Sequence, residues 1–237
     1  MPITLLRDAI YRVCGRDATL KRLKFTNDCY DSFLDFEQEN ESDDDDNDRD
    51  SVAEDNLELL RGDFCGEDTW YESLGGMIGS LPYLKHFAFE KIDPEREELR
   101  RFWGEVQGSR SIRTIECIKM DMTNAEEFLI WFDRDSNVKN LNFEKCRIGA
   151  NIGYYLSDGG GGNETTNKNL RFDQCDFRAL EGRESIIDFC QGLGGIKGLS
   201  LVLFKHCQFK SDKMRKMLGL MIGEDLPPDE VVVTFII

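Results

Sequence analysis

Hydrophobic residues recur along the chain in one frame: two apolar positions separated by a single residue, followed three residues later by a cysteine. The clearest copies are VKNLNFEKCRI (138–148), NLRFDQCDF (169–177) and LVLFKHCQF (201–209). Alternation of this kind is typical of a short β-strand that buries one face. Three copies of the frame indicate an internal repeat.

Laid along the whole chain, the frame fits about eight irregular units, with periods between 26 and 34 residues. The longest period contains an acidic run. Each unit supplies one predicted strand, whose two apolar positions should face a common core. These pairs are Leu23/Phe25, Leu57/Leu59, Phe87/Phe89, Ile115/Cys117, Leu141/Phe143, Leu170/Phe172, Val202/Phe204 and Val233/Phe235.

Between the predicted strands the apolar residues follow the period of an α-helix. In DPEREELRRFWGEV (93–106), Asp93 is a suitable N-cap and Pro94 a suitable first helical residue. Residues 150–156 predict only a short helix, because a glycine run follows them. Further helices are expected within 4–13, 123–132, 182–193 and 211–222.

A strand and a helix of this size cannot bury their apolar faces alone, but stacked units can share a continuous core. The sequence therefore predicts an α/β fold over residues 1–237: a single solenoid with a curved parallel sheet inside and helices outside. At the corner after each strand, a small and weakly donating side chain such as cysteine could lie against the backbone of the next unit. Cys146, Cys175 and Cys207 occupy this position.

The segment VKNLNFEKCRI resembles the L-x-x-L-x-L-x-x-(N/C)-x-L consensus of leucine-rich repeats. The repeat periods and the helical returns are similar to the ribonuclease-inhibitor-like and cysteine-containing classes, and the likeness covers residues 20–237. Phenylalanine often stands where the consensus has leucine. The resemblance implies a solenoid that binds proteins on its concave sheet, with no catalytic residues to carry over.

The residues that alternate with the core positions should line the concave face. Most of them are polar, whereas the last two units contribute apolar side chains, which would favour a contact surface. An alternative is that the last unit is framed one residue out and VVVTFII closes the core. The candidate partner-binding residues are Glu116, Asn142, Arg171, Lys205, Leu201, Leu203, Val232 and Ile236.

The last predicted strand, VVVTFII, has no following helix to cover its edge. An uncovered edge strand offers unpaired backbone groups to another strand. We therefore consider self-association, or pairing with a partner strand, at this edge. The alternative is that Pro227, Pro228 and the neighbouring acidic residues protect it.

The charge balance, 30 basic against 46 acidic residues, argues against binding to nucleic acid. Residues 37–55 carry a net charge of −10 of the total −16. Such a run is typical of a disordered loop insertion, and a basic protein partner is the sharper hypothesis. The glycine-rich segment 157–167 lacks the lysine of a phosphate-binding loop and is expected to be a flexible loop.

The chain shows no sequence signature of catalysis. It contains no G-x-S-x-G, H-E-x-x-H or C-x-x-C motif, and eight cysteines accompany only two histidines. His206 and Cys207 are adjacent, so on a strand they would face opposite sides and could not pair. We therefore expect no catalytic residues, no metal and no cofactor.

No apolar run is long enough to span a membrane, and Arg7 and Asp8 interrupt the apolar N-terminal stretch. This predicts an intracellular chain, cytoplasmic or nuclear. Two functions remain from the sequence: a non-enzymatic module that binds a protein through the concave sheet or the apolar C-terminal end, and a structural subunit of a larger assembly. An enzyme of unrecognised type is the third and weakest alternative.

Overall fold

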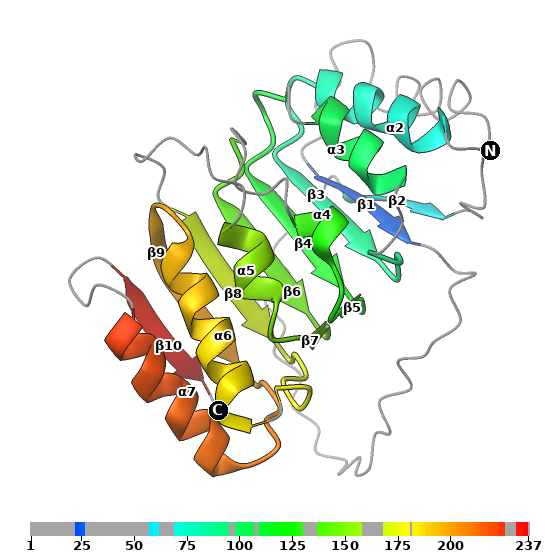
Figure 1. The fold of residues 1–237 in the computed structure, drawn as a ribbon. Helices are drawn as coiled ribbons and strands as arrows, with labels where there is room; N and C mark the ends of the chain where they lie inside the picture. Colours follow the sequence, from blue (N-terminus) through cyan, green and yellow to red (C-terminus); the bar gives the residue numbers. More distant parts are fainter. Residues whose placement is uncertain are drawn as a thin grey trace, which may run out of the picture.

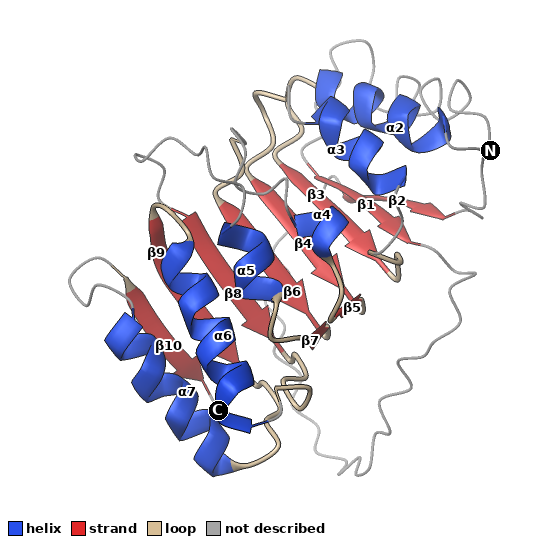
Figure 2. Ribbon diagram, viewed as in Figure 1, coloured by secondary structure: helices blue, strands red, loops and turns tan. Residues whose placement is uncertain are grey.

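A computed structural model describes residues 22–26, 57–61, 69–94, 98–106, 109–129, 137–157, 168–180, 182–225 and 231–236. They form an eight-stranded sheet in which neighbouring strands run parallel, and the helices lie along one face of it (Figures 1 and 2). This confirms the predicted α/β class. The expected helix at 4–13, the acidic run 37–55 and residues 158–167 of the glycine-rich loop lie outside the described residues.

The described strands and helices alternate along most of the chain. The strands of the main sheet are β1 (Arg22–Thr26), β2 (Leu57–Arg61), β3 (His86–Glu90), β4 (Thr114–Ile118), β6 (Asn140–Glu144), β8 (Lys168–Asp173), β9 (Leu199–Lys205) and β10 (Val232–Ile236). Two short strands, β5 (Asp121–Met122) and β7 (Arg147–Ile148), pair separately. The helices are α2 (Thr69–Ser80), α3 (Glu98–Val106), α4 (Glu126–Leu129), α5 (Ile152–Ser157), α6 (Gly182–Gly195) and α7 (Asp212–Asp225).

From β3 to β10 the strands follow one another in chain order, as stacked units require. At the other end the expected order is wrong, because β1 pairs with β3 and β2 lies outside β1. The predicted register of β2 is also wrong by one residue: Leu57, not Asn56, stands beside Arg22. In the described sheet β2 has a neighbour on one side only, so a single strand pairing determines its register.

The core lies between the sheet and the helices. Along β6, for example, Leu141 and Phe143 are buried and the residues between them are half-buried. At the second core position of four successive strands the phenylalanine rings stack nearly parallel, with centroid distances of 5.1, 5.2 and 4.7 Å. These rings belong to Phe143, Phe172, Phe204 and Phe235, which we call the phenylalanine stack.

Helices α3 to α7 lie in the regions predicted for them, whereas no helical segment was identified at α2 from the sequence. Along α6, Ile186, Cys190 and Leu193 are buried as expected, and α5 is short as expected. One detail differs: Pro94, expected as the first helical residue, lies in a turn, and α3 is described only from Glu98 onwards. Residues 95–97 between them lie outside the described residues.

The corner after each strand has the same backbone geometry in five units. One residue there takes a left-handed conformation, with φ between 51° and 55°. Its N–H donates to a carbonyl of the following strand at 2.8–3.0 Å, so each corner is bonded to the next unit. The left-handed residues are Lys91, Lys119, Lys145, Gln174 and His206.

The corner cysteines bond in the opposite direction from the one expected. The thiols of Cys146, Cys175 and Cys207 donate to carbonyls of the preceding strand, not of the next unit, at 3.2–3.4 Å. The residue before each cysteine has a left-handed backbone conformation, and the thiol that follows it points toward the preceding strand. Burial raises the pKa of Cys146 to about 12, so this thiol remains protonated and able to donate.

The left-handed corner gives a first prediction, for Lys145→Gly. A left-handed conformation costs a non-glycine residue about 1–2 kcal/mol, so glycine is expected to raise the free energy of unfolding by up to about 1 kcal/mol despite its greater freedom in the unfolded chain. Lys145→Val is expected to lower it. Urea titration followed by circular dichroism measures both. The control is Lys139→Gly, at an exposed residue without positive φ, and this substitution should leave the stability unchanged or lower it. A lower free energy of unfolding for Lys145→Gly would contradict the prediction.

Candidate protein-binding surface

Alternate residues of the strands point away from the helices and line a face of the sheet that no described helix covers (Figure 2). We call this side the open face. Strand pairing aligns its residues in three rows that cross β1, β3, β4, β6, β8, β9 and β10. All eight candidate residues lie on it: Glu116, Asn142, Arg171 and Leu203 in the middle row, Leu201 and Val232 in the row before, and Lys205 and Ile236 in the row after.

The N-terminal part of the open face is charged and internally paired. Lys24 Nζ lies 2.8 Å from Glu90 Oε2, and Lys119 Nζ lies 3.2 Å from the other carboxylate oxygen of Glu90. His86 Nε2 lies 3.0 Å from Glu116 Oε2. Burial raises the pKa of Glu116, but the hydrogen bond to His86 and the positive charges of His86, Arg22 and Lys24 together outweigh this effect and hold that pKa below its usual value. Glu116 is therefore ionised and already bonded within the chain.

The middle of the open face carries a chain of polar hydrogen bonds across four strands. Asn140 Nδ2 donates to Thr114 Oγ1 at 3.2 Å, and Asn169 Nδ2 donates to Asn140 Oδ1 at 2.8 Å. The Ser200 hydroxyl continues the chain by donating to Asn169 Oδ1 at 3.0 Å. These bonds fix the orientation of the amide groups, so this part of the face presents a preorganised polar surface.

Two of the predicted basic residues converge on one carboxylate. Arg171 Nη2 and Lys205 Nζ lie 2.8 and 3.1 Å from Asp173 Oδ2. Burial raises the pKa of Asp173, but the two hydrogen bonds and positive charges hold it below its usual value. Arg171 and Lys205 thus remain on the surface, with part of their charge already compensated.

The C-terminal part of the open face is apolar. Val232 and Ile236 are 61% and 44% exposed, and Leu201 and Leu203 beside them are half-buried. Val233 and Phe235, which alternate with them, pack against the core. The strand VVVTFII therefore contributes side chains to both the core and the open face. The alternative that the last unit is framed one residue out is wrong. We call Leu201, Leu203, Val232 and Ile236 the apolar end.

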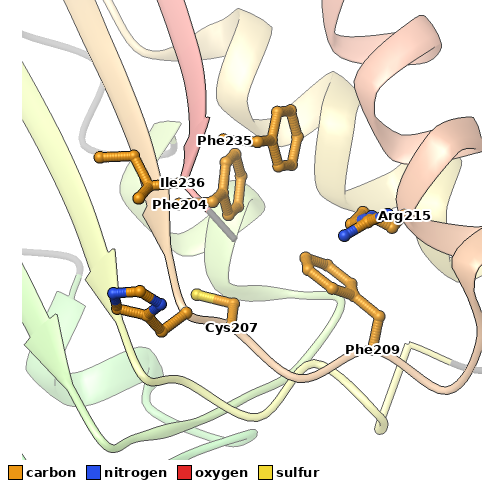
Figure 3. A pocket seen from close by; sticks show the side chains of 7 residues that line it. Phe204, Cys207, Phe209, Arg215, Phe235 and Ile236 are labelled. Carbon is orange, nitrogen blue, oxygen red and sulfur yellow. The ribbon is translucent and has the colours of Figure 1, made fainter.

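The expectation that His206 and Cys207 face opposite sides of a strand is wrong. β9 ends at Lys205, and both following residues lie at the left-handed corner, where the opposite-face rule for strands does not apply. Both border a cavity of about 290 Å³, seen in Figure 3. The Cys207 thiol donates to the carbonyls of Phe172 and Lys205, at 3.4 and 3.5 Å.

This cavity, which we call the corner cavity, was not anticipated from the sequence. Its walls come from four separate parts of the chain: β9, the corner, α7 and β10. A sequence signal that could have drawn attention to this region is the cluster of basic residues in 205–216, inside an otherwise acidic chain. Its lining residues are Phe204, His206, Cys207, Phe209, Arg215, Phe235 and Ile236.

Within the described ranges, no group of three or more histidine, cysteine or acidic side chains is arranged to hold a metal ion. The helices in those same ranges are too short or too polar to cross a membrane.

A scan against protein-family models finds no match to this chain, and a search of curated proteins finds no significant match either. A function must therefore be inferred from the residues of the chain itself.

Proposed function

We propose that this chain is a leucine-rich-repeat solenoid whose open face is concave and binds a protein partner, without catalysis of its own. The repeating corners support the solenoid: five units share the left-handed residue, and three share the thiol-to-carbonyl bond. The unit order is regular from β3 to β10, and β1 and β2 form an atypical end. Atypical terminal units are common in repeat proteins.

The observation that carries the binding function is the apolar end. A contiguous patch of exposed hydrophobic side chains often marks an interaction site, whereas single exposed hydrophobic residues are common on any protein surface. Here two exposed and two half-buried aliphatic side chains lie side by side across β9 and β10, next to the Arg171 and Lys205 positive charges. An apolar centre flanked by polar groups is the usual anatomy of a protein interface.

The second candidate function is that of a structural subunit of a larger assembly. It is favoured by β10, which pairs on one side with β9 and has no strand on its other side among the described residues. A neighbouring subunit could cover this edge and the apolar end together. Sedimentation velocity of the tagged chain from the source cell separates the two: a recognition module has a free pool, whereas a structural subunit sediments only with its assembly.

The binding function predicts that Leu203→Glu abolishes capture of the partner. A carboxylate in the apolar centre of an interface would be buried without compensation, which is expected to weaken binding by about a hundredfold or more. The measurement is a pull-down from the source cell with mass spectrometry, using the intact chain and the variant. Leu203 is half-buried, so circular dichroism must first show that the variant is folded.

The matched control is Leu220→Glu, the same change at a leucine that is 70% exposed on α7, away from the open face. It should retain the partner. Equal capture by both folded variants would contradict binding through the apolar end, and loss of the partner in both would show that the effect is not specific to this surface.

A further inference from the structure

The corner cavity lies in a basic region of an acidic molecule. Residues 205–216 contain five lysine or arginine residues and one aspartate, a local net charge of +4 in a chain of net charge −16. His206, Lys210, Lys213 and Lys216 are exposed, and the half-buried Arg215 lines the cavity itself. Arg215 Nη2 pairs with Asp212 at 3.1 Å, but that aspartate side chain is 83% exposed, and such exposed pairs are weak. The Arg215 guanidinium at the cavity wall is therefore largely available to a ligand.

The cavity has an apolar side, formed by three phenylalanine rings and Ile236, beside a polar side that carries Arg215 and His206. Phe204 and Phe235 lie face to face in Figure 3, with their ring centroids 4.7 Å apart. Phe209 is held by a stacking contact with Phe177 at 5.2 Å. A cavity of about 150 Å³ accommodates a benzene ring, and this one measures about 290 Å³. It has room for one large apolar side chain, aromatic or aliphatic.

We propose that the corner cavity binds an acidic peptide segment of a protein partner, inserting one large apolar side chain while carboxylates beside that side chain pair with Arg215 and the surrounding lysines. The proposal rests on the proposed function that the chain binds a protein, and it adds the chemistry of the partner. Ile236 lines the cavity and is also part of the apolar end, so a partner on the open face can reach this site. The partner segment expected here is acidic, whereas the acidic run 37–55 predicts a basic partner.

The arrangement of the rings favours a peptide over a single-stranded nucleic acid. Base stacking needs an aromatic face open to the ligand. Both faces of Phe204 are covered, by Phe172 at 5.2 Å and by Phe235 at 4.7 Å. One face of Phe209 is covered by Phe177. Of the three phenylalanine rings that line the cavity, Phe204 therefore has no open face, and Phe209 and Phe235 each have one face covered, which disfavours the stacking of successive bases.

The test is fluorescence anisotropy of a labelled peptide with one phenylalanine flanked by three acidic residues on each side, titrated with the full chain at low salt. Saturable binding is expected, and it should be lost when serine replaces the peptide phenylalanine or lysine replaces its acids. Arg215→Glu is expected to weaken binding by about tenfold or more, because it reverses the charge at the cavity wall. Lys216→Glu, an exposed substitution that leaves the walls intact, should weaken it by about threefold.

The matched control is Arg183→Glu, the same substitution at an exposed residue at the start of α6, which should change affinity by less than about twofold. Absence of saturable binding to the intact chain would overturn the proposal, as would equal affinities of the Arg183 and Arg215 variants. Displacement of the peptide by a thymidine oligonucleotide of equal charge, at equal or lower concentration, would overturn it in favour of nucleic acid.

The pull-down with Leu203→Glu separates failure of this proposal from failure of the proposed function. A partner captured by Arg215→Glu but lost by Leu203→Glu would leave the open face as the binding site and overturn the cavity. Peptide binding that is lost in Arg215→Glu, with no cellular partner captured through the apolar end, would support the cavity and overturn the open face.

Discussion

Phe172→Ala is expected to lower the free energy of unfolding by about 3–5 kcal/mol, the usual range for a buried phenylalanine replaced by alanine. Phe172 is fully buried in the middle of the phenylalanine stack, with Phe143 at 5.1 Å and Phe204 at 5.2 Å. Its ring also meets Phe177 edge-on at 5.3 Å. The substitution removes ring contacts to both neighbouring units and leaves a cavity between them.

Urea-induced unfolding followed by circular dichroism measures this loss. Phe235→Ala is the control, because it stands at the end of the stack, is only half-buried, and stacks on one ring at 4.7 Å. Its effect is expected to be less than half that of Phe172→Ala. Similar losses for the two variants would mean that the stack does not transmit stability between units.

Gly192→Ala is expected to destabilise the protein by about 3 kcal/mol or more, at the upper end of the range for overpacking. A Cβ atom on Gly192 would lie 2.2 Å from the carbonyl carbon of Gly153 and 2.3 Å from the backbone nitrogen of Tyr154. The obstruction is backbone, so no side chain can rotate away. Helices α5 and α6 would have to separate, opening the core beneath them.

Thermal unfolding provides the measurement, and Gly104→Ala is the control within another helix. Nothing lies within 4 Å of a Cβ at Gly104, so alanine there is expected to stabilise the protein by about 0.5–1 kcal/mol through its helix propensity. A Gly192→Ala variant that unfolds at the same temperature as the unchanged chain would show that α5 and α6 are not packed backbone to backbone.

The strand positions could be predicted because alternation is local. Leu141 and Phe143 are separated by one polar residue, and any sheet that buries one of them buries the other. The same reasoning places Leu203 and Ile236 on the opposite side, and strand pairing adds their alignment with Arg171 and Asp173. The residues of the open face followed from the period of the chain, because each unit repeats the same pattern.

The features that could not be predicted depend on which segments meet in space. The position of β2 outside β1 reflects a choice between two neighbours that the strand sequences do not distinguish. At Gly153 and Gly192 the backbones of α5 and α6 approach closely, and the apolar patterns of the two helices do not predict this short distance. His206 was misplaced because it was treated as a strand residue, whereas its left-handed backbone turns it into the corner cavity.

The sequence by itself determined the repeated pattern, the α/β class and the two faces of the strands other than β2, because these depend on the local spacing of apolar residues. Only the tertiary structure decided the order of the first two strands, the direction of the cysteine hydrogen bonds and the corner cavity. Each of these depends on distances between units, and such distances arise when backbones pack against one another and not from any local pattern.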